Sequence, residues 1–267
     1  MAQPTKEVIG VLGGMGPHAG LDLVRKIFDQ TDARIDQEHL PVALLSYPER
    51  IIDRSTFLFG QTDENPAYAM AAIARQLDRV GAVVGAVPCN TAHAPAIFDV
   101  MCEEVARTGH SIRMLHMIDE TVRFMQTHLP DIGCVGTLST LAVYELGLHR
   151  RPMEAAGFEV VTPDTAIQKE VVNQTIFDET YGLKAHSNPV TPKARKQLLY
   201  AIDHLREKGA DAVVLGCTEL PLAPLVGELD LPLIDPTEIV ARALIEAVHP
   251  EHLRPLAPHY AAYATTP

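Results

Sequence analysis

Two cysteines in this sequence stand where a thiol could act as an acid or a base. Cys89 follows the apolar run 82–87, which predicts a buried strand, and residues 94–101 predict a helix after it. A strand that turns into a helix exposes its turn at the carboxyl end of the strand, where open α/β sheets bind ligands. The free N–H groups at a helix start also favour the thiolate form of a cysteine placed there.

The second such cysteine lies in the later half of the chain. Cys217 follows the short apolar run 212–216 and precedes Thr218 and Glu219. The order is the same as around Cys89: an apolar run, a small residue, a cysteine and polar neighbours. Two thiols at matching strand ends are the main indication of function.

The two thiols admit three interpretations, of which the first two explain less. Most free cysteines are small buried apolar residues, but that does not explain why both stand at matching turns followed by hydrogen-bond donors. A zinc site would use Cys89 and His93, one helical turn apart, with Cys217 as a third ligand. The sequence has no Cys-x-x-Cys pair, however, and His93 suits a supporting or capping role better. We therefore expect no metal.

The third interpretation is proton transfer at a carbon acid. One thiolate removes the Cα proton of an amino acid from one face, and the other thiol returns a proton to the opposite face. Cysteine suits this task because its pKa, once tuned by a helix start, lies near the operating pH. Asn90, Thr91 and Thr218 stand next to the thiols and could donate hydrogen bonds to the α-carboxylate as charge develops. Such a racemase needs no cofactor.

The composition favours a globular, cytoplasmic enzyme. The 267 residues suffice for a sizeable core, and a formal net charge of −12 argues against nucleic acid and anionic membranes as partners. The first residues lack the apolar segment of a secretory leader, and no stretch approaches the roughly 18 apolar residues of a membrane span. Four cysteines in a chain of this length are no disulfide framework, so we expect reduced thiols.

A glycine-containing turn, residues 13–17, follows the first expected strand, 7–12. Its spacing weakly resembles a dinucleotide fingerprint. However, no acidic residue ends the second expected strand, 40–45, where a ribose would need one. We therefore expect no nucleotide cofactor.

The pattern of the first half restarts in the second. Residues 132–137 echo 9–14, and each cysteine strand is preceded by a helix. This consistent order predicts two related α/β halves facing each other. The repeat places the domain boundaries near 110 and 222, so that residues 1–110 with 222–267 form one domain and 111–221 form the other.

A long connection, residues 46–65, holds proline, glycine and charged residues with little periodicity. Long loops of this kind are commonly lids or binding loops. It carries Arg54, which on its own is most simply interpreted as a solvated loop arginine. Whether this loop closes over a substrate is left open.

Beyond these patterns, six segments carry a resemblance to a known family: 13–17, 53–54, 88–93, 136–137, 168–169 and 216–220. They resemble the aspartate/glutamate racemase superfamily, and within it the aspartate racemase branch, over nearly the whole chain. The resemblance implies an α/β fold of two pseudo-symmetric domains, each a mostly parallel sheet flanked by helices. It also implies an active site in the inter-domain cleft, catalysis without a cofactor, and a homodimer.

The resemblance further implies a role for particular residues toward a dicarboxylic amino acid. Cys89 and Cys217 resemble the two catalytic acid/bases. The expected substrate-binding residues are Met15 lining the pocket, Asn90, Thr91 and Thr218 on the α-carboxylate and amino group, Arg54 and Lys169 on the side-chain carboxylate, and Thr137 and Glu219.

We therefore expect racemisation of an acidic amino acid, with aspartate preferred over glutamate. Two related enzymes remain as alternatives, a hydantoin racemase and a maleate isomerase. The pair Arg54 and Lys169 favours a dicarboxylate, which weakens the hydantoin alternative. A catalytically silent dicarboxylate-binding protein is the alternative from a different class, and it would not need either cysteine as a thiolate.

Overall fold

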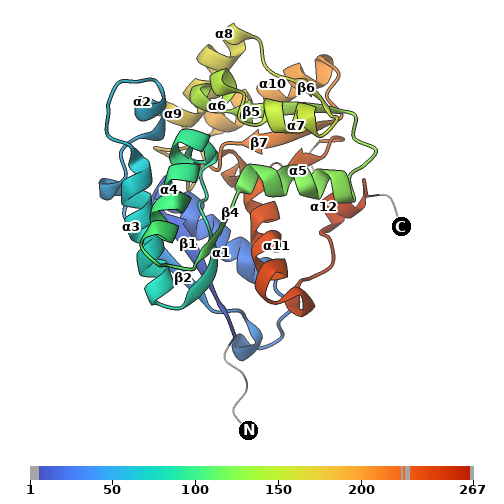
Figure 1. The fold of residues 1–267 in the computed structure, drawn as a ribbon. Helices are drawn as coiled ribbons and strands as arrows, with labels where there is room; N and C mark the ends of the chain where they lie inside the picture. Colours follow the sequence, from blue (N-terminus) through green and yellow to red (C-terminus); the bar gives the residue numbers. More distant parts are fainter. Residues whose placement is uncertain (1–5, 224, 226–228, 265–267) are drawn as a thin grey trace. The chain divides into compact units, whose positions relative to one another are not determined.

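The computed structural model describes residues 6–223, 225 and 229–264, which form two compact units (Figure 1). The first unit contains residues up to Met117 together with Thr237–Pro255. The second contains Ile118–Pro236 together with the residues from Leu256 onward. The division expected from the repeat differs in detail: it assigns residues 111–117 to the second domain, and the described residues of 222–236 and 256–264 to the first.

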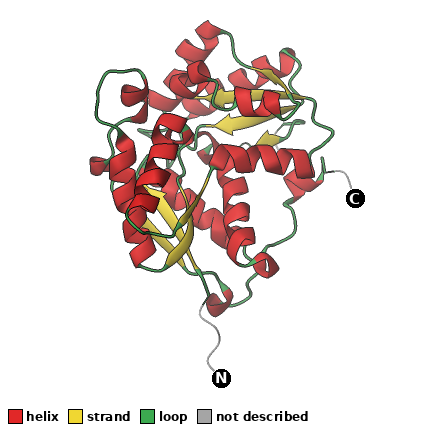
Figure 2. Ribbon diagram, viewed as in Figure 1, coloured by secondary structure: helices red, strands yellow, loops and turns green. Residues whose placement is uncertain are grey.

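Each unit alternates strands and helices (Figure 2). The elements of the first unit are β1 (Val8–Gly13), α1 (Pro17–Gln30), η1 (Asp36–Glu38), β2 (Val42–Ser46), η2 (Pro48–Arg50), α2 (Arg54–Leu58), α3 (Pro66–Arg79), β3 (Ala82–Ala86), η3 (Asn90–His93), α4 (Pro95–Arg107), β4 (Arg113–Leu115), α11 (Pro236–Val248) and η6 (Pro250–His252). Those of the second unit are α5 (Met117–His128), β5 (Cys134–Ser139), α6 (Leu141–Leu146), α7 (Arg150–Ala155), β6 (Glu159–Val161), α8 (Thr165–Ile167), η4 (Gln168–Val172), α9 (Asn173–Phe177), α10 (Pro192–Glu207), β7 (Ala212–Gly216), η5 (Leu220–Leu222), β8 (Leu233–Ile234) and α12 (Pro258–Ala261).

The helices that lead into the two cysteine strands begin in the same way. Asn65 caps α3 by accepting a hydrogen bond from the backbone N–H of Ala67 at 2.9 Å, and Pro66 takes the first helical position. Thr191 caps α10, and Pro192 follows it in the same place. A polar cap followed by proline satisfies a free N–H and presets the backbone, so both starts are encoded locally.

The two sheets have the same strand order. Four parallel strands form the first sheet in the order β2-β1-β3-β4, and four more form the second in the order β6-β5-β7-β8. Adding four to each strand number of the first sheet gives the second. The expected α/β architecture of two related, parallel-sheet halves is therefore confirmed, and the two cysteine strands, β3 and β7, occupy equivalent places.

The first sheet is buried on both faces. On one face, Ile9 and Val11 of β1 pack with residues of α1 and α11. On the other, Leu12 packs with residues of α3 and α4. Burial on both faces explains why the strands are short, nearly continuous apolar runs.

The core of the second unit joins β5 and β7 to α10, η4 and α9. The chain end contributes as well. Tyr260 is fully buried, its hydroxyl accepts a hydrogen bond from the backbone N–H of Asp235 at 2.9 Å, and its ring contacts Phe124. The composition of the last residues suggests a peripheral tail, but this tyrosine anchors the part that the structure describes.

The half-buried carboxylate of Asp78, near the end of α3, binds the segment that leads into β4. Asp78 accepts hydrogen bonds from the His110 ring at 2.7 Å and from the backbone N–H groups of Ser111 and Ile112 at 3.0 and 2.9 Å. These donors, His110 foremost, lower the pKa of Asp78. A lowered pKa stabilises the fold above the ordinary carboxyl pKa of about 3.9, and this contribution is lost as the pH falls through the folded-state value.

The variant Asp78→Asn should therefore lower the free energy of unfolding by about 1–2 kcal/mol at neutral pH. Urea unfolding at several pH values should show this difference shrinking below about pH 4, where the unfolded carboxyl takes up a proton, and disappearing once the pH falls below the lowered folded-state pKa. Asp203→Asn is the matched control, because Asp203 forms an exposed ion pair with Arg206 along its own helix, and such pairs contribute little to stability. A difference that persists unchanged in acid would contradict the role of the Asp78 charge.

Candidate functional site

Each sheet has a topological switch point between its two central strands. From β1 the chain crosses to β2 on one side, and from β2 it returns to β3 on the other. The same reversal occurs between β5 and β7. Loops at the carboxyl ends of such strand pairs diverge and leave a crevice, which is where doubly wound sheets bind ligands. Both cysteines lie in these loops.

Cys89 lies at the start of a tight turn directly after β3. Its side chain is buried, and it occupies the cap position of the 3-10 turn η3. The long helix α4 begins only afterwards, at Pro95. The sequence predicts a cysteine at the start of a helix, whereas the chain inserts one short turn first. The free N–H groups nearest to Cys89 therefore belong to a single turn rather than to the long helix.

The His93 side chain folds back onto the main chain of this turn. Its Nδ1 lies 2.9 Å from the main-chain oxygen of Cys89, and its ring stacks on Phe98 with centroids 4.8 Å apart. His116 contacts both rings edge-on. His93 thus supports the backbone of the cysteine turn. Asn90 and Thr91, both buried, lie in the same turn.

Arg54 does not behave as a solvated loop arginine. It begins the short helix α2, which Asp53 caps by accepting a hydrogen bond from the backbone N–H of Thr56 at 2.9 Å. The Arg54 side chain is buried, with Nη1 at 3.4 Å from the main-chain oxygen of Ile52. Helix α2 lies against η3, so the guanidinium comes from an element that contacts the cysteine turn.

Met15 comes from the loop after β1 and packs in the same buried cluster as Cys89. This loop packs closely against the chain that follows β2. Gly14 has a φ of 109°, and a Cβ at this position would lie 3.0–3.2 Å from backbone atoms of Tyr47 and Pro48. Glycine is therefore required at this position. In the first unit the structure thus gathers Met15, Arg54 and the turn of Cys89 around the ends of β1 and β3.

Cys217 follows β7 and has charged neighbours. Its Sγ donates a hydrogen bond to Oε2 of Glu219 at 3.0 Å, and the hydroxyl of Thr218 lies 3.5 Å from the same oxygen. The Lys184 ammonium lies 3.6 Å from Oε1 of Glu219. Burial raises the pKa of the Cys217 thiol well above its ordinary value, and the Glu219 carboxylate raises it further, while Lys184 lowers it.

Thr137 and Lys169 complete the predicted residues of the second unit. Thr137 is buried on β5, beside Val214 of the cysteine strand. Lys169 is exposed and lies in η4, a single π-helical turn. Gln168 in that turn is fully buried, and its Nε2 donates to the main-chain oxygen of Ser139 at 2.9 Å. This bond ties the π turn to the end of β5; such turns are frequent at functional sites.

Sequence reasoning missed three residues near the cysteine loops. His116 contacts the ring of His93, and Lys184 reaches Glu219 from the connection between α9 and α10. The His149 ring lies 2.9 Å from the position that a Cβ on Gly216 would occupy. None stands in a motif, and each is far in sequence from the residue that it contacts, so no local signal could have found them.

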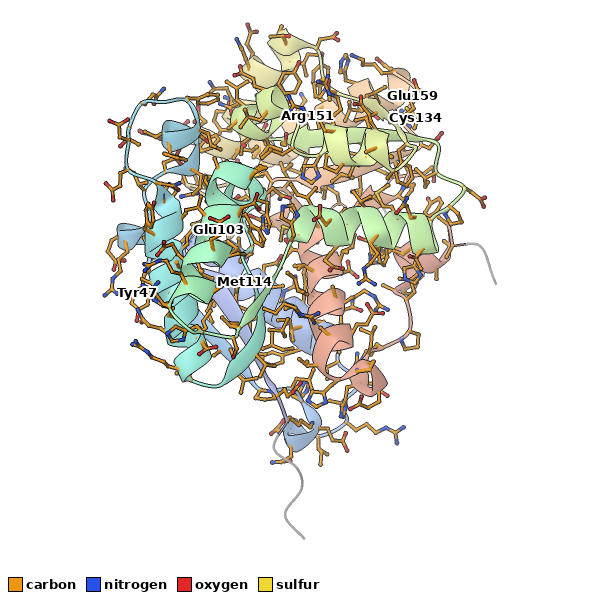
Figure 3. All side chains as sticks on the ribbon, in the orientation of Figure 1. Tyr47, Glu103, Met114, Cys134, Arg151 and Glu159 are labelled. Atoms are coloured by element: carbon orange, nitrogen blue, oxygen red, sulfur yellow. The ribbon has the colours of Figure 1, made fainter. Side chains whose placement is uncertain are left out.

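The other two thiols lie away from these loops. Cys102 is half-buried in α4, where burial raises its pKa to about 11. Cys134, at the start of β5, lies beside Glu159 of β6 (Figure 3). Burial, with the nearby carboxylates, also raises the pKa of Cys134.

In the part of the chain that the structure describes, no group of three or more His, Cys, Asp or Glu side chains is arranged to hold a metal ion. None of the helices in the described ranges combines the length and apolarity needed to traverse a bilayer.

Comparison with known proteins agrees with this geometry. The chain is 28% identical to the aspartate racemase of Picrophilus torridus, with a TM-score of 0.77 over 96% of this chain and 99% of that one. An aspartate racemase homologue from Pyrococcus horikoshii matches at 25% identity, with a TM-score of 0.68 over 91% and 99% of the two chains. The broad specificity amino-acid racemase RacX of Bacillus subtilis is 25% identical over 89% of this chain and 96% of its own.

The model of one protein family, described as Asp/Glu/Hydantoin racemase, matches residues 12–244. That span includes both cysteine loops, the whole second sheet and all of the first sheet except the beginning of β1. The chain therefore belongs to the Asp/Glu/Hydantoin racemase family.

Proposed function

We propose that this protein racemises an acidic amino acid, with aspartate preferred over glutamate, through two thiols and without a cofactor. Cys89 and Cys217 are the proposed acid/bases. One removes the Cα proton as a thiolate, and the other delivers a proton to the opposite face as a thiol. The two exchange roles in the reverse direction.

One observation carries the proposal. Two sheets of identical strand order each place a buried cysteine directly after the equivalent strand, β3 or β7, at the switch point. A buried structural cysteine has no reason to recur at this loop, whereas a two-base reaction needs one thiol for each face of the carbon. The thiol is suited to this role because its pKa responds strongly to burial and nearby charge.

The carbon acid is weak, so the extra charge that develops on the α-carboxylate must be stabilised. Asn90 and Thr91 beside one thiol, and Thr218 beside the other, are buried polar side chains suited to donate hydrogen bonds to it. Donors held in a buried site are effective because they need little reorganisation as the charge develops.

The preference for a dicarboxylate rests on Arg54 and Lys169. A buried guanidinium can bind a carboxylate through two parallel hydrogen bonds. The name of one relative, an aspartate racemase, supports the same class, whereas the broad specificity named for another supports only an amino acid as substrate. Homodimeric assembly and a cytoplasmic location belong to the proposal as well. The first rests on the sequence resemblance, and the second on the composition and cysteine content.

The test is proton exchange at Cα in D₂O. Purified protein is incubated with L-aspartate or L-glutamate, with a chelator and without pyridoxal phosphate. The Cα–H signal is followed by NMR, and the D-isomer by chiral chromatography. We expect exchange together with D-product, faster for aspartate. Activity that disappears with the chelator would contradict the thiol mechanism, and absence of both exchange and D-product would contradict racemisation of these acids.

A further inference from the structure

The surroundings of Cys217 are unusual for a thiol that must ionise. Its hydrogen-bond acceptor is the carboxylate of Glu219, and both side chains are more than nine-tenths buried. A carboxylate accepts a hydrogen bond only from the thiol form of the cysteine, and it repels the thiolate. Glu219 therefore favours the protonated form of Cys217.

Lys184 counteracts this effect from another element. It lies in the connection between α9 and α10, and its ammonium is 3.6 Å from the Glu219 carboxylate oxygen that does not accept from the thiol. Two oxygens of one carboxylate thus face a thiol and an ammonium. Lys184 partly neutralises Glu219 and so weakens its hold on the proton.

One further titratable side chain approaches this strand end, and a second lies in the same core. The His149 ring, at the start of α7, lies against Gly216. The second, Tyr181, belongs to the same large core cluster as Cys217, though its contacts are elsewhere in that cluster, with Lys193 over its ring. The carboxylate of Glu219 is the acceptor of the thiol proton, and Lys184 forms the ion pair that balances it.

We propose that Glu219 holds the proton on Cys217 before substrate binds, and that Lys184 limits the strength of this hold, so that Cys217 enters the reaction as the proton donor. This inference rests on the proposed two-thiol function and deepens it. Glu219 is then a positioning residue for the proton, rather than a substrate-binding residue, and Lys184 sets how strongly the proton is held. The directions of the Cys217 pKa agree: Glu219 raises it and Lys184 lowers it.

The step balances without any further reactant. The Cys89 thiolate forms an S–H bond as the Cα–H bond breaks, and the electron pair stays on the substrate. The Cys217 S–H bond then breaks, and its proton forms the new Cα–H bond on the opposite face. Cys217 is left as a thiolate beside Glu219, and Cys89 is left as a thiol. Once the product leaves, the repulsion between Glu219 and the thiolate favours the return of a proton to Cys217 from water, and Cys89 gives up its proton to water, which restores the starting state.

The test is the alkylation of Cys217 by iodoacetamide, followed by peptide mass spectrometry so that the other thiols do not interfere. Only the thiolate reacts, and below the pKa each unit of pKa change alters the thiolate fraction about tenfold. At about pH 8, Glu219→Gln should raise the alkylation rate roughly tenfold, since it removes the carboxylate. Lys184→Gln should lower the rate several-fold, and Lys184→Arg should restore it.

Lys193→Gln is the matched control, because Lys193 lies over the Tyr181 ring and not beside Glu219. It should leave the alkylation rate unchanged. Opposite changes in the Glu219 and Lys184 variants would establish the opposing effects of these two side chains on the proton, since loosened packing would increase the rate in both. An unchanged rate in Glu219→Gln, or the same change in both variants, would overturn it.

The pH profile of kcat/KM separates this inference from the proposed function. If Cys217 is a catalytic acid/base, the alkaline limb should move to lower pH in Glu219→Gln, in step with alkylation. If the alkylation rate of Cys217 rises as expected while the pH of the alkaline limb is unchanged, Glu219 does hold the proton, but Cys217 is not a catalytic acid/base. A raised KM for aspartate with unchanged alkylation would return Glu219 to substrate binding and overturn the inference.

Discussion

The variants Cys89→Ser and Cys217→Ser should each lose racemisation by a factor of about 10³ or more. A hydroxyl nearly keeps the size of the side chain, but it is far too weak an acid to be present as an anionic base, or to donate its proton readily, near neutral pH. The loss should appear in kcat, measured as D-product from L-aspartate by chiral chromatography. Binding of aspartate, measured by calorimetry, should change little.

The serine variants also separate the two thiols. A variant that keeps one working thiol can still exchange the Cα proton from its own face in D₂O, without inversion. Cys102→Ser and Cys134→Ser are the matched controls, because these half-buried thiols lie in α4 and at the start of β5, away from the cysteine loops. Both controls should keep full activity. Full activity in either Cys89→Ser or Cys217→Ser would refute the two-base mechanism.

The variant Arg54→Met should reduce kcat/KM for aspartate by a factor of about 10²–10³, while any activity on alanine changes little. Breaking a buried, charged interaction between a guanidinium and a carboxylate costs about 3–4 kcal/mol. Alanine has no side-chain carboxylate, so its complex does not contain this interaction. The measurement is the ratio of kcat/KM for the two substrates in the variant and in the wild type.

The buried position of Arg54 calls for a folding control. Its guanidinium lies near the main-chain oxygen of Ile52, so the thermal midpoint of Arg54→Met should be recorded alongside the kinetics. Arg50→Met is the matched variant from the same loop, since Arg50 is exposed and lies over the Tyr47 ring. An equal loss for aspartate and alanine in Arg54→Met would argue against a side-chain clamp.

Local signals in the sequence were enough to predict much of the fold. Asn65 followed by proline, and Thr191 followed by proline, define helix starts that need no partner elsewhere in the chain. The short apolar runs before Cys89 and Cys217 identify buried parallel strands, and their order gives the repeat. Helix starts and buried strands of this kind can be predicted from the sequence because each depends only on neighbouring residues.

The parts of the site that could not be predicted depend on contacts between distant segments. Arg54 is typical of an exposed loop residue until α2 packs against the cysteine turn. Lys184 lies in a connection without periodicity, and only the folded chain brings it to Glu219. Lys169 lies in a π turn whose Gln168 bonds the end of β5, a contact between segments 29 residues apart that no local pattern indicates.

The position of α11 constrains how the chain can be made. This helix follows the whole run of β5 to β8 in sequence, yet Val240, Leu244 and Ile245 belong to the apolar cluster on one face of the first sheet. During synthesis, strands β1 to β4 therefore leave the ribosome long before the helix that covers them. The first unit cannot complete its core until the second has been synthesised. Until then, the apolar face of the first sheet that α11 covers is exposed and can form non-native contacts. Arrest of translation just before Pro236 should thus leave a first unit that is sensitive to protease.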